Sequence, residues 1–294
     1  MRKTLLNAAA IALALFLHQG RAAAAEIPTT QPIDISQSTP TKQLRDMDTD
    51  RPNKTNTPHT VDAGHLQIET GFFDYDYDRN LYQGANARTD ALDLGQFNFR
   101  VGVLDNLELN AIIDSYDFLR SADYITNQSA HQNGLGDLTL GGKFNFWGNE
   151  SGGAPWATAL GIQPQFKVPT ARESLGNGHT ELFVGFPFLV NLPAGFHLGL
   201  QPTISWERNS ANTGDVTGWQ NSASIDRVVV ANIDVYLEYW SHVSTQRHQE
   251  AQQTLDVGAT YPWNDNVVLD GGVNFGLNKA SDNIECLAGV SIRF

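Results

Sequence analysis

The side chains of this chain that could do chemistry are scattered and do not form a known catalytic motif. Ser241, His242 and Ser244 stand close together, and serine beside histidine is a pair used in nucleophilic catalysis. The chain has no Gly-x-Ser-x-Gly elbow, no His-Glu-x-x-His pair and no phosphate-binding glycine loop. We therefore interpret these three residues as a polar strand end, and we predict a protein that is not an enzyme and holds no cofactor.

Metal ligands give no clearer signal. Asn-Gly-His-Thr-Glu at 177–181 and the spaced acids around it suggest calcium, but calcium needs about six or more converging oxygens, which spacing alone does not show. There is one cysteine, Cys286, so neither an internal disulfide nor a multi-cysteine metal site is expected. We predict no metal site, and calcium in the outer loops stays an open alternative.

Charge excludes one class of partner. The net charge of the 294 residues is −13 and the pI is about 4.9, whereas binding to nucleic acid needs a basic face. Only 17% of residues are charged, which is low for a soluble protein, yet the mean hydropathy of −0.30 does not indicate membrane helices. The composition thus excludes nucleic acid and leaves the class of protein to be decided by pattern.

The first 25 residues have the pattern of a cleaved secretory signal peptide. Arg2 and Lys3 precede an apolar run from Leu5 to Leu17, and small residues follow as far as Ala25. The run is too short for a spanning helix, which needs about 20 apolar residues. Export from the cytoplasm is therefore expected, with an irregular segment rich in Pro, Thr, Asn and Asp over 26–62.

Alternation with a period of two fills the remainder, residues 63–294. Ile233, Val235 and Leu237, for example, alternate with Asp234 and Glu238. Twelve such stretches are separated by turn residues: 63–75, 91–103, 107–118, 135–147, 155–168, 179–191, 196–208, 219–229, 232–243, 253–263, 266–277 and 284–294. Short connections alternate with longer polar ones, which predicts an all-β, closed, antiparallel up-and-down barrel of about 12 strands in an outer membrane.

Aromatic residues favour such a barrel over a soluble β-sandwich. The six tryptophans, at 147, 156, 206, 219, 240 and 263, all fall near predicted strand ends. A soluble core would bury tryptophan in mid-strand, whereas barrels in lipid place it in girdles at the two interfaces. Tyr261, Phe118, Phe166 and Phe294 fit the same girdles.

The last nine residues, Cys-Leu-Ala-Gly-Val-Ser-Ile-Arg-Phe, alternate up to a terminal aromatic ring. This ending resembles the closing strand of bacterial outer-membrane barrels, which commonly end on phenylalanine. That resemblance implies that the assembly machinery reads Phe294. Because an open edge in lipid costs several kcal/mol per unpaired backbone group, this strand must pair with the first, near 64–73.

In each strand, alternate residues point to opposite faces of the sheet. If the set that is mostly apolar faces lipid, the other set must face the lumen. Lys or Arg facing lipid would cost about 2–4 kcal/mol near the midplane, so the parity is well determined for most strands. The candidate lumen-lining residues are the acids Glu69, Glu108, Asp114, Asp137, Glu181, Glu207, Asp226, Asp234, Glu238, Asp256, Asp270 and Glu285, with the bases Arg100, Lys143, Lys167 and Arg293. These residues can either line a passage or form an ion-paired plug, because side chains can nearly fill the lumen that twelve strands enclose.

Three stretches carry a resemblance to one family. They are Thr-Asp-Arg-Pro-Asn-Lys-Thr-Asn-Thr-Pro-His-Thr-Val-Asp-Ala-Gly-His-Leu-Gln-Ile-Glu-Thr-Gly-Phe at 49–72, Gly-Leu-Gly-Asp-Leu-Thr-Leu-Gly-Gly-Lys-Phe at 134–144 and Phe-Lys-Val-Pro-Thr at 166–170. They resemble outer-membrane transporters of the phenol-degradation meta-pathway type. The resemblance runs from 49 to 294 and implies a barrel that passes small organic compounds, with aromatic or hydrophobic ones as candidates. One departure from the family pattern is Ala171, because the residue after the Pro-Thr pair is usually glycine.

Two functional classes stay open: a channel or transporter for small solutes in the outer membrane, and a barrel without transport that is an enzyme or a structural or adhesive module. Asp50, Arg51 and Pro52 form an N-terminal motif that we expect against the periplasmic mouth or in the lumen, with a tail lacking fixed structure as the alternative. Pro164, Pro187 and Pro202 fall in three consecutive strands, where proline cannot donate to the ladder. A kink or bulge is expected there.

Overall fold

The structure is a computed structural model that describes residues 35, 38–81, 85–150, 152–172 and 175–294. The predicted signal peptide, 1–25, lies outside the described residues, and so does most of 26–37. A short 3₁₀ turn, η1 (Thr41–Gln43), precedes the first strand. None of the helical segments in the described part of the chain is long and apolar enough to cross a membrane.

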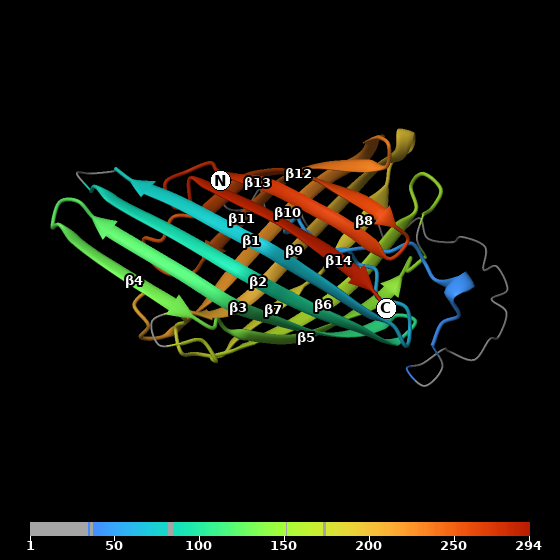
Figure 1. Ribbon diagram of the computed structural model, residues 1–294, viewed down its shortest axis with the longest axis horizontal. Coiled ribbons are helices and arrows are strands. Elements are labelled where there is room, and N and C mark those ends of the chain that lie inside the picture. Colours follow the sequence, from blue (N-terminus) through green and yellow to red (C-terminus); the bar gives the residue numbers. More distant parts are fainter. Residues whose placement is uncertain (1–34, 36–37, 82–84, 151, 173–174) are drawn as a thin grey trace, which may run out of the picture. The chain divides into compact units, whose positions relative to one another are not determined.

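One antiparallel sheet closes on itself (Figure 1). Its strands are β1 (Leu66–Asn80), β2 (Ala87–Leu104), β3 (Leu107–Asp123), β4 (Gln128–Gly134), β5 (Leu138–Trp147), β6 (Thr158–Val168), β7 (Glu181–Gly185), β8 (Phe188–Asn191), β9 (Phe196–Arg208), β10 (Asp215–Val230), β11 (Ile233–Ser244), β12 (Gln252–Asn264), β13 (Val267–Gly276) and β14 (Ile284–Arg293). β4 and β5 share one place beside β3, and β7 and β8 share one between β6 and β9. The predicted barrel of twelve positions is therefore confirmed.

The seam between the two ends of the sheet is fully paired. β14 runs antiparallel to β1 from Gln67↔Arg293 to Tyr77↔Ile284. The Phe294 N–H donates to the carbonyl of Leu66 at 2.8 Å, and the Leu66 N–H donates back at 3.3 Å. The predicted pairing of the last strand with the first is thus confirmed, and no edge is left open at this seam, as the cost of unpaired backbone in lipid requires.

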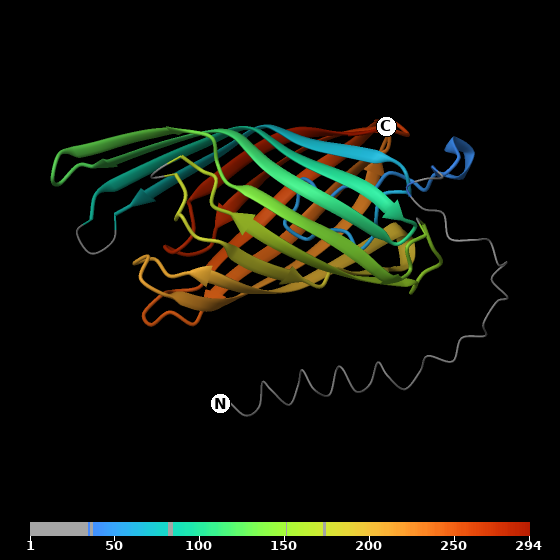
Figure 2. The same cartoon turned by 90° about the horizontal axis from the view of Figure 1, so that it is seen from below.

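The two ends of the barrel differ in their connections. At one end, two-residue turns at 105–106, 231–232 and 265–266 join neighbouring strands. We call this the short-turn half and the opposite end the long-loop half. There β1, β2 and β3 continue several residues beyond their predicted ends and, with β4, project past the other strands (Figures 1 and 2).

The outer face is apolar, with aromatic rings near strand ends. Tryptophans 147, 156, 206, 219 and 263 are exposed, and so are Phe118, Phe166, Tyr261 and Phe294. Trp240 differs from the predicted girdle: its ring lies 5.2 Å from the Nζ of Lys54 and packs near His242. Trp240 shares the parity of Glu238 and His242, so alternation places it inside, and its girdle assignment is wrong.

The three prolines disturb the wall less than expected. β6 and β9 continue through Pro164 and Pro202, and only the strand at 179–191 breaks, at Phe186 and Pro187. The register is the same on both sides of the break, because Gln163↔Gly185 and Leu160↔Phe188 belong to one ladder. Gly161 donates to the carbonyl of Pro187 at 2.9 Å, so the wall is interrupted without a slip.

Candidate functional site: the lumen and the segment inside it

Residues 48–62, which we call the lumen segment, lie inside the barrel (Figure 2). Their polar contacts reach opposite walls: the partners belong to β1, β2, β3, β5, β6, β9, β10, β11, β12, β13 and β14. A segment held by so many strands has little freedom of position. The alternative of a tail without fixed structure does not describe this part of the chain.

Backbone amides of the segment are satisfied by carboxylates of the wall. The Asp50 N–H donates to Glu69 at 3.1 Å, and the amides of Lys54 and Thr55 donate to Glu238, each at 2.7 Å. Buried N–H groups need such partners, and a charged acceptor makes the bond stronger. The inner acids therefore fix the irregular backbone of the segment in place of a sheet ladder.

Five charged groups meet at the centre of the short-turn half. Arg100 contacts Glu69 at 2.6 Å and Glu108 at 2.9 Å, and Lys143 contacts Asp50 at 2.7 Å. Arg100, Lys143, Glu69 and Glu108 are at most 1% exposed. Buried charges cost several kcal/mol each unless they are paired and hydrogen-bonded, and each of these five groups has a partner of opposite charge within 4 Å. Sequence alternation placed four of them inside, and the structure adds Asp50 of the N-terminal motif.

Arg51 passes close to the backbone of two glycines in the wall. Its guanidinium donates to Asp270 at 3.2 Å and passes across β14 and β1. A Cβ on Gly289 would lie 2.8 Å from Nε and Nη2 of Arg51, and one on Gly71 would lie 3.2 Å from Nη1. Glycine therefore allows the close approach of the arginine to the backbone. Pro52, the third residue of the motif, is buried.

Lys54 connects the segment to the long-loop half. Its Nζ lies 3.2 Å from Glu285 and 3.4 Å from Asp256, over the ring of Trp240. Burial alone would lower the pKa of Lys54, but the charges of Glu285 and Asp256 outweigh burial and hold the pKa above its ordinary value. Lys54 is therefore a fixed positive charge among acids.

A histidine contact orders the other end of the segment. The Nδ1 of His59 lies 2.6 Å from Asp48, and the Thr57 hydroxyl donates to the same oxygen at 2.6 Å. Burial raises the pKa of Asp48, but the hydrogen bond and charge of His59 outweigh it and lower the pKa to about 2. Asp48 is thus a shared acceptor that holds both His59 and Thr57.

The other predicted lining residues form local pairs. Lys167 bridges Asp137 at 3.7 Å and Glu181 at 2.6 Å, and Arg293 reaches Asp62 at 3.4 Å. The remaining acids on that face are Asp114, bonded to Gln96 at 2.9 Å, Glu207, paired with His242 at 2.8 Å, Asp226, paired with His197 at 2.8 Å, and Asp234. Their role in solute passage stays a prediction.

In both the stretch at 241–244 and the possible calcium stretch at 177–181, the key side chains already have partners in the barrel. His242 is engaged by Glu207, so it does not face Ser241, which has the opposite parity. In 177–181, Glu181 accepts from Asn177 at 2.7 Å while it pairs with Lys167. That carboxylate already has a lysine and an amide as partners.

Sequence reasoning missed a band of acids in the long-loop half. Asp74 stands opposite Asp93, and Asp93 opposite Asp117, on adjacent strands β1, β2 and β3. All three are half-buried, and one carboxylate oxygen each of Asp74 and Asp117 is buried without a hydrogen bond. Asp76 and Glu285, also opposite one another, extend the band to β14.

A change of parity explains the omission. On β3 the exposed residues are Leu109 and Ile113 before the change, and Tyr116 and Phe118 after it. On β1, both Phe72 and Phe73 are exposed, and the register against β14 shifts there. A bulge of this kind moves later side chains to the other face. The sequence signal was the pair Phe72-Phe73, which breaks the alternation.

The comparisons with known proteins agree with this geometry. The model of the family described as "Putative MetA-pathway of phenol degradation" matches residues 49–294. The chain belongs to this family. No curated protein matches it. The matched region begins at the lumen segment, so the family model includes both the segment and the barrel.

Two solved structures show the same fold. An outer membrane channel from Pseudomonas putida F1 is similar at a TM-score of 0.57 and 13% identity, covering 78% of this chain and 94% of that one. The transport unit of the autotransporter AIDA-I from Escherichia coli is similar at 0.51 and 11%, covering 84% and 92%. At these identities the likeness shows the outer-membrane barrel fold alone, because one fold serves several functions.

Proposed function

We propose that this member of the family is a passive outer-membrane channel for small solutes. The observation that supports it best is the inner face of the long-loop half, where half-buried carboxylates line a closed barrel whose outer face is apolar. The short turns would lie in the periplasm and the longer loops outside, as in barrels of this class. Lipid surrounds the wall, and the assembly machinery inserts it.

The class of solute follows from charge and family. The family description names phenol degradation, which supports small organic compounds, aromatic ones included. A narrow lumen lined by acids focuses a negative potential and raises the local concentration of cations. Neutral aromatic compounds should therefore pass more readily than aromatic carboxylates of the same size.

The lumen segment supports a second candidate, a barrel that does not transport. Its contacts with so many strands fill the short-turn half, where Arg100, Lys143, Glu69 and Glu108 have almost no exposed surface. A plugged barrel of this kind would act as a structural or adhesive module. The two candidates differ in one measurable property, the conductance of the purified protein.

Planar-bilayer recordings separate them. We expect discrete conductance steps from the wild-type protein, and larger steps when Arg51→Ala removes the contact with Asp270 that holds the segment against β13. Arg88→Ala is the matched control, because Arg88 pairs with Asp90 on β2, away from the segment. If neither the wild type nor Arg51→Ala conducts, the channel proposal fails and the plugged barrel stands.

A further inference from the structure

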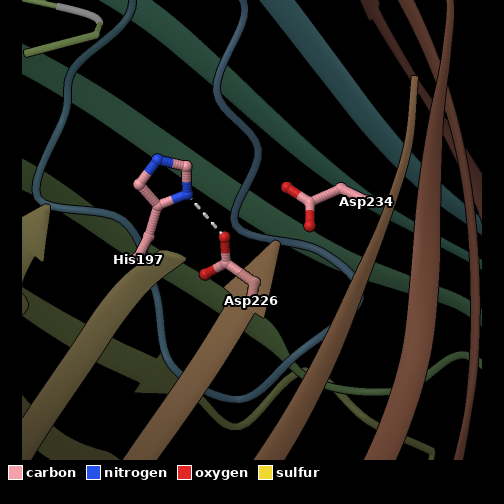
Figure 3. A group of neighbouring side chains, drawn as sticks. All are labelled: His197, Asp226 and Asp234. Atoms are coloured by element: carbon pink, nitrogen blue, oxygen red, sulfur yellow. Dashed lines mark hydrogen bonds and ion pairs between the residues drawn. The ribbon is translucent and has the colours of Figure 1, made fainter. Parts of the chain in front are cut away.

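Three side chains, His197, Asp226 and Asp234, meet at the short-turn end of β9, β10 and β11, and all three are of types that can bind metal ions (Figure 3). His197 is the second residue of β9, Asp226 lies near the end of β10, and Asp234 is the second residue of β11, after the two-residue turn at 231–232. One donor atom from each lies within 4.8 Å of the others, and the Nδ1 of His197 is 2.8 Å from Asp226.

The strand register, and not a loop, fixes this arrangement. Asp226 is directly opposite His197 in the β9–β10 ladder. Asp234 is opposite Val228, so it is the diagonal neighbour of Asp226 on the same face of β10 and β11. Direct and diagonal neighbours on one face of a sheet lie about 5–8 Å apart between backbones, which long side chains span easily. The three groups are thus held ready before any ligand arrives.

The charge of the cluster is unbalanced. The recorded ion pair of Asp226 is with His197, and Oδ1 of Asp234 is buried with no hydrogen bond among the described residues. Deeper carboxylates such as Glu69 and Glu108 contact Arg100 instead. A buried oxygen without a donor is unfavourable, and a cation between the two carboxylates would satisfy it.

We propose that His197, Asp226 and Asp234 bind one divalent transition-metal cation of the Zn²⁺ type. One imidazole nitrogen with two carboxylate oxygens is a donor set that Zn²⁺ accepts, with solvent completing the shell. Bonds of about 2.0–2.2 Å in a tetrahedron separate the ligand atoms by about 3.3–3.6 Å. The His197–Asp226 contact must widen slightly from 2.8 Å and Asp234 must approach, and both are side-chain rotations.

Proton balance accompanies binding. The imidazole of His197 holds a proton on Nδ1 while it donates to Asp226, and that proton leaves when Nδ1 takes the metal. Asp226 exchanges the N–H donor for the cation, and Asp234 gains a partner for its buried oxygen. The cation then links three adjacent strands beside the lumen segment.

A second group of carboxylates in the lumen shows what distinguishes this site. Asp74, Asp76 and Glu285 also bring donor atoms within 4.8 Å of one another. Glu285, however, already contacts the ammonium of Lys54 at 3.2 Å. A positive charge is therefore present there, and no nitrogen ligand belongs to the group.

The test is a calorimetric titration with Zn²⁺. The sample is the full-length mature barrel in detergent, purified without a polyhistidine tag. We expect one site per chain, with Asp234→Asn and His197→Gln each weakening it at least as much as the roughly 10–100-fold that losing an outer-shell partner costs. His242→Gln is the matched control, because the Nε2 of His242 lies at the same 2.8 Å from Glu207. His242 belongs to neither three-residue group of potential metal ligands among the described residues.

Co²⁺ provides an independent readout, since its visible absorption reports coordination geometry. The wild type and His242→Gln should show the same bound spectrum, and the two site variants should lose it while keeping heat-modifiable gel mobility as evidence of folding. Absence of stoichiometric binding by the wild type overturns the proposal. So does binding that survives in both folded site variants, or that His242→Gln abolishes.

Discussion

In the short-turn half of the lumen, Arg100 and Lys143 are almost completely buried and contact Glu69, Glu108 and Asp50. In the long-loop half, Asp74, Asp93 and Asp117 are half-exposed and stand opposite one another on adjacent strands. Around Arg100 and Lys143, bases and backbone amides neutralise the acids. In the band of Asp74, Asp93 and Asp117, acids face acids across adjacent strands.

The difference shows how one inner face can serve two purposes. Burying an ion pair is tolerated only when every partner is present, so the short-turn half behaves as a unit whose members depend on one another. Acids opposite one another on a sheet repel when they are ionised, so the acidic band is expected to lower stability. Under the proposed function, that cost is offset by the field that the ionised acids create in the lumen.

The largest expected effect concerns the seam where the last strand, β14, pairs with the first, β1. Deleting Phe294 removes its reciprocal backbone bonds with Leu66 and the last aromatic ring. We expect loss of most of the assembled barrel in the outer membrane, measured as heat-modifiable protein per cell. Phe294→Tyr keeps the backbone and a ring and should assemble normally. Normal levels of the deletion variant would show that closure does not depend on this residue.

Breaking the paired network should come second. Arg100→Met leaves Glu69 and Glu108 buried without their arginine, which costs about 3–5 kcal/mol when a buried pair is broken. Urea unfolding in detergent measures the change. Arg88→Met, which removes an exposed pair with Asp90 in the other half, should leave the free energy of unfolding nearly unchanged.

A double change sharpens that result. Arg100→Met with Glu108→Gln removes one of the stranded charges, so it should be more stable than Arg100→Met alone. Equal stability of Arg100→Met and Arg88→Met would contradict the distinction between a buried, interdependent network and an exposed pair.

Much of this comparison was accessible from the sequence. Strict alternation predicted twelve barrel positions and placed Arg100, Lys143, Glu69 and Glu108 on one face, because charge facing lipid is costly in every strand. The partner of Lys143 was not predictable, since its contact with Asp50 joins residues 93 positions apart through an irregular segment.

The acidic band was missed for a different reason. A bulge at Gly71–Phe73 reverses the parity on β1, and the exposed residues of β3 show the same reversal between Ile113 and Tyr116. A count of alternating residues does not contain that step. The cluster of His197, Asp226 and Asp234 depends on the register of three strands, which the sequence of each strand leaves undetermined. Two sequence signals conflict at Trp240. Its nearness to a strand end predicts the girdle, whereas its place in the alternation predicts the lumen, and the second signal is correct.

Neutralising the acidic band should give the next effect in size. We expect the wild-type channel to favour cations over anions, and Asp74→Asn with Asp93→Asn and Asp117→Asn to move its reversal potential in a salt gradient toward zero. Stability should be unchanged or higher, because three carboxyl groups that face one another are removed. Asp265→Asn, on a short turn, is the control and should leave selectivity unchanged. Anion selectivity of the wild type would show that this band does not line the path.

The smallest effect is expected at the break between β7 and β8, which lies between the short-turn and long-loop ends of the wall. A route through the wall would require the strands to part at Pro187, whose ring cannot donate to the ladder. The register is unbroken on both sides, Pro187 is fully buried, and its carbonyl accepts from Gly161. We therefore expect a disulfide between Leu160→Cys and Phe188→Cys, a directly opposite pair, to leave uptake of a neutral aromatic solute unchanged in a Cys286→Ala background. The same chain after reduction is the control. Uptake that falls on oxidation and recovers on reduction would show that solute leaves through this wall, and the passage would then begin in the acidic half without crossing the paired one.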